Sequence, residues 1–152
     1  MFNVFEEVTL KLNQNLNVIP LLYGSLGLET RTGHTMDPKD IDLLLPKRFF
    51  NEQWFGLITL MNELGFELVD LQEREFIRED TSVAFSDIEE LNDFAGIEFE
   101  SIEILKEQDI EFLLLNEEQY LKVYSKSILD SYRKDKNNGK DLMKIEILKS
   151  IL

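Results

Sequence analysis

Two short stretches decide the fold: Leu22–Ser25, which reads Leu-Tyr-Gly-Ser, and Asp40–Leu45, which reads Asp-Ile-Asp-Leu-Leu-Leu. The first stretch ends the apolar run Val18–Tyr23, which predicts a buried strand entering a tight turn at Gly24. The second stretch predicts another apolar strand, because it is short, rich in leucine and followed by a proline. Between them, residues 29–39 are mostly polar and predict a loop.

The second strand carries two aspartates in a pattern that suits a metal ion. Asp40 and Asp42 are two residues apart, so their side chains point to the same face, roughly 6.6 Å apart along the strand. Carboxylates on an otherwise apolar strand need water or a cation to satisfy their charge. Hard carboxylate oxygens suit Mg²⁺ or Mn²⁺, and such ions bridge the oxygens of a phosphoryl group during transfer. Gly24 and Ser25 end the preceding strand, where backbone N–H groups and a hydroxyl can approach a phosphate.

Together the two stretches resemble the signature of the DNA polymerase β-type nucleotidyltransferase superfamily. That signature is an apolar strand, a Gly-Ser turn, then an aspartate, an apolar residue and an acidic residue. The resemblance implies an Mg²⁺- or Mn²⁺-dependent enzyme that moves a nucleoside monophosphate from a nucleoside triphosphate to a hydroxyl or phosphate acceptor. It makes Gly24 and Ser25 nucleotide-binding residues, and Asp40 and Asp42 both metal ligands and catalytic residues.

The end of the chain adds to this resemblance. Residues 118–142 are similar to the closing helices of small bacterial nucleotidyltransferase-like proteins, including toxin components of abortive-infection systems and resistance-type enzymes. In those proteins a lysine on the first helix and a Lys-Asp pair opening the last one lie near the nucleotide. The resemblance therefore implies that Lys122 and the pair Lys140-Asp141 lie near the nucleotide here.

The superfamily's third carboxylate, on a later strand, has two possible positions in this sequence. In one alignment Ala84 occupies the place of the acidic residue. A shift of three residues brings Asp87 there instead, as the general base for the attacking hydroxyl. In the polar loop, Arg31 is a candidate triphosphate contact, whereas the single histidine, His34, reads as an ordinary loop residue.

The remaining patterns predict an α/β or α+β domain with a small mixed sheet flanked by helices. Helical periodicity predicts an opening helix over residues 2–16 and another over 54–64. Strands are expected over residues 66–71, 75–78 and 82–88, with an edge strand within 97–105. Asn116 and Gln119 form a predicted capping box for a helix that buries Leu121, Tyr124 and Ile128. Asn-Asn-Gly at 137–139 predicts a break, after which Asp141 caps the last of two C-terminal helices.

Composition limits the possible functions. The 152 residues fit one domain spanning 1–152, and the hydrophobic content of 43% is that of a folded protein. No apolar run is long enough for a membrane span, and the N-terminus does not read as a secretory signal. The absence of cysteine excludes disulfides and thiol chemistry and favours the cytoplasm.

Charge is unevenly distributed along the chain. A net charge of −14 argues against broad, non-specific binding of nucleic acid. Residues 121–152 nevertheless carry eight basic and four acidic residues, a net of +4, which reads either as a solvated basic face or as a wall facing a polyanion such as a nucleoside triphosphate.

Three functions are consistent with these patterns. The first is the metal-dependent nucleotidyltransferase that the resemblance implies, acting on an unidentified acceptor. A second is a catalytically degenerate member that binds nucleotide without transfer, because the third carboxylate is absent in one alignment. The third is a protein-interaction module, such as one half of a toxin–antitoxin or phage-defence pair, whose acidic surface meets a basic protein partner.

Overall fold

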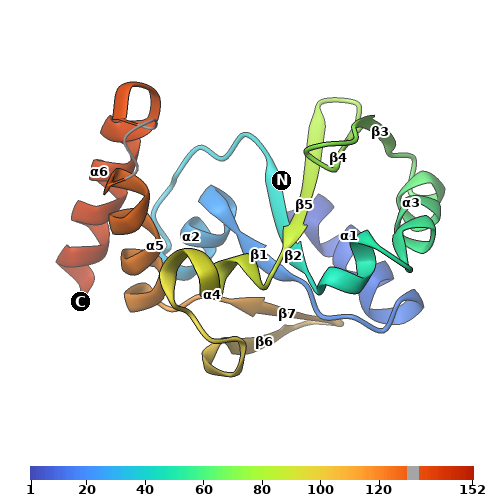
Figure 1. Ribbon diagram of the computed structural model, residues 1–152, viewed down its shortest axis with the longest axis horizontal. Coiled ribbons are helices and arrows are strands. Elements are labelled where there is room, and N and C mark those ends of the chain that lie inside the picture. Colours follow the sequence, from blue (N-terminus) through green and yellow to red (C-terminus); the bar gives the residue numbers. More distant parts are fainter. Residues whose placement is uncertain (130–133) are drawn as a thin grey trace.

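The computed structural model of the protein describes residues 1–129 and 134–152. Its strands are β1 (Leu21–Tyr23), β2 (Ile41–Leu45), β3 (Glu67–Asp70), β4 (Glu75–Arg78), β5 (Thr81–Asp87), β6 (Glu103–Glu107) and β7 (Ile110–Leu114). Its α-helices are α1 (Phe2–Asn15), α2 (Gly24–Thr32), α3 (Trp54–Glu63), α4 (Glu90–Ala95), α5 (Glu117–Leu129) and α6 (Lys134–Ile151). The strands form one mixed sheet in the order β3-β4-β5-β2-β1-β7-β6. Helices α5 and α6 lie at one end of the molecule, and α1 and α3 at the other (Figure 1).

The two stretches that decide the fold are neighbours in the middle of this sheet. Strand β1 runs antiparallel to β2, which pairs Tyr23 with Asp42. Strand β2 runs parallel to β5, which pairs Asp42 with Ala84. Because paired residues share a face and alternate residues change face, Asp42, Ala84 and Ser86 face one side. Leu43 faces the other side and is fully buried.

Aromatic side chains fill much of the core. The ring of Phe5 on α1 meets the ring of Phe112 on β7 edge to face, with centroids 5.1 Å apart. Phe76 on β4 meets Phe85 on β5 in the same way at 5.7 Å. Edge-to-face pairs contribute roughly 0.5–1.5 kcal/mol each beyond the area they bury. These pairs tie the first helix to one half of the sheet and the β4–β5 hairpin together in the other half.

Most of the predicted elements are confirmed. The opening helix, both central strands, the helix after them and the β3–β4–β5 segment all occur where their periodicity predicts. The edge strand expected within 97–105 is β6, which begins later than predicted, at Glu103, and lies at one end of the strand order. Helices α2 and α4 and strand β7 were not predicted. None of the described helices is long and apolar enough to cross a membrane.

The loop predicted over residues 29–39 begins only after residue 32 in the structure. Helix α2 continues through Thr32, and Gly33 ends it in the left-handed conformation at φ +77°. Contacts with distant residues hold this last turn: Arg31 donates to the carbonyl of Leu115, and Glu29 accepts a hydrogen bond from the N–H of Met36. Long-range contacts therefore extend a helix that local sequence alone does not indicate.

The predicted break at residues 137–139 is wrong. Helix α6 begins at Lys134 and runs through this stretch to Ile151 without interruption. Asp141 is therefore not a helix cap; it is buried and accepts a hydrogen bond from Ser127 of α5 at 3.1 Å. The pattern predicts that this helix buries Leu142, Ile145 and Leu148; Ile145 and Leu148 are buried, whereas Leu142 is exposed. The apolar contact of the two buried residues stabilises the helix although Asn-Asn-Gly is a poor helix-forming sequence.

Helix α5 begins as predicted, and of the three residues expected to be buried Tyr124 is buried, whereas Leu121 and Ile128 are only partly buried. The other buried residues include Tyr120, Val123 and Ser127. The hydroxyl of Tyr120 donates to the carbonyl of Leu22 in β1, so a polar contact helps to set which face of the helix points inward.

Candidate functional site

Gly24 brings the start of helix α2 against the carboxylate of Asp42. Its φ of +68° is strained for any residue with a Cβ. A Cβ built at Gly24 would lie 2.5 Å from Oδ2 of Asp42, closer than real contacts allow. Only glycine therefore permits the chain to leave β1, turn and start a helix directly over the second strand. The first N–H groups of α2 and the carboxylate are thereby placed next to each other.

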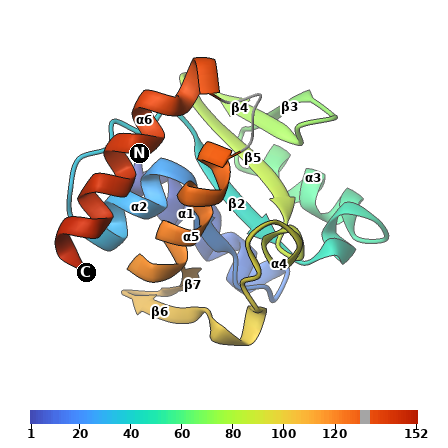
Figure 2. The same ribbon diagram turned by 60° about the vertical axis from the view of Figure 1, so that its left-hand side comes forward.

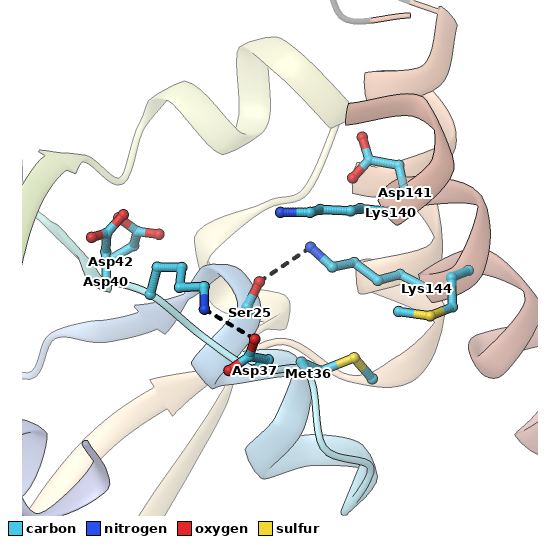
Figure 3. A pocket seen from close by; sticks show the side chains of 10 residues that line it. Ser25, Met36, Asp37, Asp40, Asp42, Lys140, Asp141 and Lys144 are labelled. Atoms are coloured by element: carbon cyan, nitrogen blue, oxygen red, sulfur yellow. Dashed lines mark hydrogen bonds and ion pairs between the residues drawn. The ribbon is translucent and has the colours of Figure 1, made fainter. Parts of the chain in front are cut away.

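Ser25 follows and contacts a lysine from the end of the chain. The ammonium of Lys144 on α6 donates to Ser25 Oγ at 3.1 Å (Figure 3). The same ammonium lies 4.9 Å from the centre of the Tyr124 ring. Burial lowers the pKa of Lys144, and the nearby charge of Lys140 acts in the same direction, while Asp141 and Asp42 oppose both. Lys144 is thus a partly desolvated cation held over a serine at a helix start.

Sequence patterns did not single out Lys144, although a signal for it exists. It lies four residues after Lys140, so the two lysines share one face of any continuous helix. The resemblance implied a role for the pair Lys140-Asp141 only, and the predicted break at 137–139 started the last helix too late for this spacing to be considered. Both Lys140 and Lys144 line the same cavity of about 410 Å³, together with Ser25, Asp40 and Asp42.

Asp40 and Asp42 reach this cavity from the opposite side (Figure 3). Burial and the charge of Asp40 raise the pKa of Asp42 from 3.8 to about 6, with Glu75 adding to the rise and Lys144 opposing it. When Asp42 is ionised, its buried negative charge is unfavourable, and a bound cation would stabilise it.

The donor set of the two aspartates fits a divalent ion only in part. Among residues 1–129 and 134–152, no three acidic or histidine side chains come together as a metal-binding group. Asp40 and Asp42 could therefore supply two hard oxygen ligands, and phosphate oxygens and water would have to supply the rest. That arrangement is the one Mg²⁺ commonly adopts with phosphate substrates.

The neighbouring strand places no acidic residue beside Asp42. Its partner on β5 is Ala84, the residue that one sequence alignment put at the third carboxylate. Asp87 pairs with Leu45 instead, and its Oδ1 accepts a hydrogen bond from the N–H of Glu89 at 2.9 Å. Three residues of strand separate Ala84 from Asp87, roughly 10 Å. Asp87 therefore lies at the end of β5, away from the position opposite Asp42.

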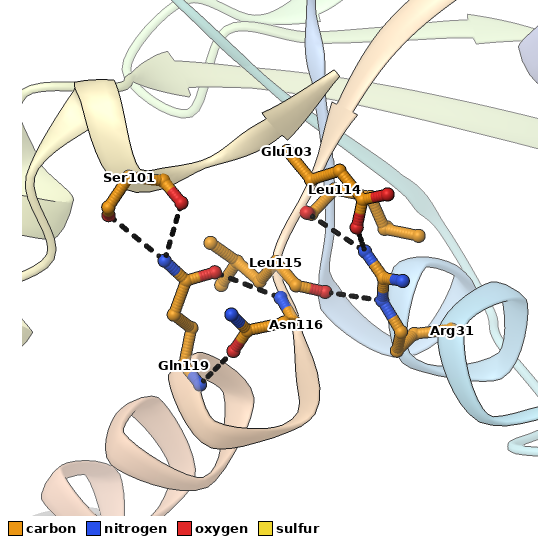
Figure 4. Close-up of polar contacts among 7 residues, drawn as sticks. All are labelled: Arg31, Ser101, Glu103, Leu114, Leu115, Asn116 and Gln119. Atoms are coloured by element: carbon orange, nitrogen blue, oxygen red, sulfur yellow. Dashed lines mark hydrogen bonds and ion pairs between the residues drawn. The ribbon is translucent and has the colours of Figure 1, made fainter. Parts of the chain in front are cut away.

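Two other sequence-predicted residues lie outside the cavities around Asp42. Arg31 points to the far side of α2, where its guanidinium donates to the carbonyls of Leu115 and Leu114 and to Glu103 at 2.9 Å (Figure 4). Lys122 is exposed on α5 and lines none of the cavities around Asp42. Arg31 is therefore a structural contact between α2 and the end of β7, and Lys122 lies on the exposed side of α5.

The predicted capping box of α5 is present. The N–H of Asn116 donates to Oε1 of Gln119 at 2.9 Å, and the N–H of Gln119 donates to Oδ1 of Asn116 at 2.8 Å (Figure 4). Gln119 also donates to Ser101 before β6. These bonds fix the start of the helix that carries Tyr124 under Lys144.

Three adjoining cavities form one cleft around Asp42. The cavity with the lysines shares Ser25, Asp42, Asp141 and Lys144 with a second one of about 230 Å³. The second cavity shares Tyr23, Asp42 and Phe94 with a third of about 360 Å³. Asp42 lines all three and so lies at the middle of the cleft.

Comparison with known proteins identifies the fold and the relatives of this chain. No model of a known protein family matches it. The chain is 43% identical over all 152 residues to the uncharacterized protein YnaI of Bacillus subtilis strain 168, and the match covers 97% of YnaI.

Solved structures with the same arrangement are much more distant in sequence. An antigenic nucleotidyltransferase-like protein from Paracoccidioides brasiliensis matches with a TM-score of 0.67 and 14% identity, over 98% of this chain and 75% of that one. The antibiotic-resistance factor ANT(2'')-Ia matches in solution with a TM-score of 0.63 and 12% identity, over 97% and 82%. In complex with adenylyl-2''-tobramycin it matches with a TM-score of 0.63 and 13% identity, over 99% and 89%. The chain therefore has the nucleotidyltransferase fold and belongs to the same family as YnaI of Bacillus subtilis.

Proposed function

We propose that this protein binds a nucleoside triphosphate together with Mg²⁺ or Mn²⁺ and transfers its nucleotidyl group to an acceptor hydroxyl. One observation carries the proposal. Gly24 holds the start of α2 against Asp42 while Lys144 reaches across to Ser25. Groups that bind phosphate and groups that bind a divalent cation therefore line one cavity.

Each residue of this cavity has a distinct role in the proposal. The N–H groups at Gly24 and Ser25, with the Ser25 hydroxyl, bind the outer phosphates, and Lys144 and Lys140 neutralise their charge. Asp40 and Asp42 hold the divalent ion, which supplies charge neutralisation at the phosphate oxygens when bound. The proposal also places the reaction in the cytoplasm, as expected for a chain without cysteine.

The reaction follows from this placement. The acceptor oxygen forms a bond to the α-phosphorus, the bond from that phosphorus to the oxygen bridging to the β-phosphorus breaks, and pyrophosphate leaves with the bonding electrons. The acceptor proton passes to solvent or to a nearby carboxylate. Catalysis of this kind rests on positioning and charge neutralisation more than on covalent chemistry by the protein.

A second candidate function is nucleotide binding without transfer. Ala84 favours it, because the strand position beside Asp42 carries no group that can accept a proton or hold an ion. Replacing Ala84 with aspartate distinguishes the two. We expect Ala84→Asp to lower stability without metal, since it adds a like charge beside Asp42. If the protein only binds nucleotide, the same change creates or strongly raises transfer; if the natural site is already competent, transfer changes little or falls.

The direct test follows a label from the α-phosphate. The protein is incubated with Mg²⁺, each α-labelled triphosphate in turn and a fractionated small-molecule extract, and the products are separated. We expect a labelled adduct and equimolar pyrophosphate, both lost without metal and in the Asp40→Ala, Asp42→Ala double variant. Metal-dependent binding with no adduct and no pyrophosphate in any fraction would support the second candidate.

A further inference from the structure

A glutamate on strand β4 lies in line with Asp42 across the sheet. Strands β2, β5 and β4 are neighbours in the strand order and lie side by side (Figure 2). Asp42 on β2 pairs with Ala84 on β5, and Ala84 pairs in turn with Glu75 on β4. Because paired residues share a face of the sheet, the side chains of Asp42, Ala84 and Glu75 all project to the same side.

The residue between the two carboxylates is small. Neighbouring strands are about 4.8 Å apart, so the backbones of Asp42 and Glu75 are separated by about 10 Å. Ala84 has only a methyl group as its side chain and is partly exposed. The space over Ala84 is therefore open to water and has a carboxylate residue on each side.

A hydrogen bond fixes the Glu75 carboxylate on this face of the sheet. The hydroxyl of Ser82 on β5 donates to Oε2 of Glu75 at 2.5 Å. Ser82 is buried, and it shares the face of Ala84 because the two are separated by one residue of the strand. Among residues 1–129 and 134–152, no lysine or arginine forms an ion pair with Glu75. Its charge is thus held in place and left without a cation from the described part of the protein.

The electrostatics of Asp42 connect the two carboxylates. Burial and the charge of Asp40 are the main causes of the raised pKa of Asp42, and the charge of Glu75 raises this pKa further. Three negative groups, Asp40, Asp42 and Glu75, therefore act on the same part of the cleft. A divalent cation beside Asp42 would relieve the repulsion among all three.

The spacing of these groups indicates how Glu75 would contact such an ion. No three acidic side chains of the described residues come together as a metal-binding group, so direct binding of one ion by all three carboxylates is not the arrangement observed. Mg²⁺ loses water reluctantly and usually keeps several water ligands in protein sites. Residues that hydrogen-bond to the ligands of a metal strengthen its binding.

We propose that Glu75 is the third carboxylate of the divalent-ion site, and that it binds the water ligands of the ion from across Ala84. The inference rests on the proposed function, because the ion is the one that Asp40 and Asp42 hold there. The superfamily resemblance placed this carboxylate on β5, at position 84 or 87, whereas the strand register assigns it to β4. Local patterns do not single out Glu75, since only the pairing of three strands brings it into line with Asp42.

Binding of Mn²⁺ tests this assignment without requiring any transfer. Mn²⁺ is titrated into the full chain with the α,β-methylene analogues of ATP, GTP, CTP and UTP in turn, and the free ion is measured by electron paramagnetic resonance. We expect Glu75→Gln to lower the affinity for Mn²⁺ about tenfold or more, the usual effect of losing a group that bonds to a metal's ligands. Glutamine keeps an oxygen that can accept from Ser82, so the local hydrogen bond is retained.

Two further variants separate the position of Glu75 from its charge alone. Glu79→Gln removes one charge from the turn after β4, where Glu79 is exposed, and should leave the affinity for Mn²⁺ unchanged. The double variant Glu75→Gln, Ala84→Asp moves the carboxylate one strand closer to Asp42 and should restore most of the lost affinity. A merely structural role of Glu75 would not be rescued by a carboxylate at position 84.

The outcomes distinguish this inference from the proposed function. If the wild type and Glu75→Gln bind Mn²⁺ and nucleotide equally well, the inference is overturned and the proposed function stands. Equal losses in Glu75→Gln and Glu79→Gln, or a loss that Ala84→Asp does not restore, would also overturn it. If the wild type binds Mn²⁺ with none of the four analogues, both the proposed function and the assignment of Glu75 fail.

Discussion

At the scale of single residues, Gly24 and Asp42 depend on each other. The backbone at Gly24 adopts a conformation suited to glycine, and the space where its side chain would be is taken by the Asp42 carboxylate. Both residues could be predicted from the sequence, because a glycine after a buried strand and two aspartates two residues apart on a strand are local signals. Their contact was not predictable, since it depends on how β1 and β2 pair.

We expect Gly24→Ala to be more damaging than the same change at Gly33. Both glycines have positive φ, but nothing lies within 4 Å of a Cβ at Gly33. The shared conformational cost is about 1–2 kcal/mol, and the clash with Asp42 adds about 1–3 kcal/mol at Gly24 only. Denaturant unfolding of the two variants measures the difference, and equal free energies of unfolding would show that the contact is not tight.

The raised pKa of Asp42 predicts how stability depends on pH. Its folded-state pKa of about 6 lies above the ordinary value of 3.8, so the folded protein prefers the protonated acid. The favourable contribution is complete below pH 3.8 and is lost as pH rises through 6. At pH 8 the ionised group costs at most about 3 kcal/mol.

Replacing Asp42 tests that dependence. In metal-free buffer we expect Asp42→Asn to raise the melting temperature at pH 8 and to have little effect at pH 4. Adding Mg²⁺ should stabilise the wild type at pH 8 and leave the variant unchanged. Asp109→Asn, at an exposed turn, is the matched control. A gain for Asp42→Asn that is the same at both pH values would rule out ionisation as its cause.

At the scale of elements, α6 completes the cleft. It carries Lys140 and Lys144 to the start of α2, and its buried Asp141 joins it to Ser127 of α5. The capping box of α5 could be predicted because all its groups lie within four residues. The continuous α6 could not, because Asn-Asn-Gly locally favours a break and only packing of Leu148 and Ile145 against the rest of the protein outweighs it.

Lys144 and Lys122 give a test at this scale. Lys144→Gln removes the charge over Ser25, so we expect nucleotide affinity to fall about tenfold or more, the effect of losing a charged hydrogen bond. The free energy of unfolding should stay the same or rise, because burial already disfavours this charge. Lys122→Gln, on the exposed side of α5, should leave affinity unchanged. Equal losses in the two variants would point to general electrostatics instead of a specific contact.

At the scale of the whole molecule, strand order assembles the site from distant parts of the sequence. The order β5-β2-β1 puts Asp42 between Ala84 and Tyr23, and Lys140 and Lys144 of α6 line the same cavity as Asp42. The fold class and the central motif could be predicted from the sequence because their signals are local. The sequence left Ala84 and Asp87 open at the third-carboxylate position, and only the register of β5 against β2 decides between them.

The account's central claim is that this cleft binds a nucleoside triphosphate through a divalent ion. Calorimetric titration of ATP, GTP, CTP and UTP, with and without Mg²⁺, tests it most directly in the wild type and in the Asp40→Ala, Asp42→Ala double variant. We expect at least one triphosphate to bind the wild type only when Mg²⁺ is present, and none to bind the double variant. Absence of binding to the wild type, or equal binding to the double variant, would contradict the claim.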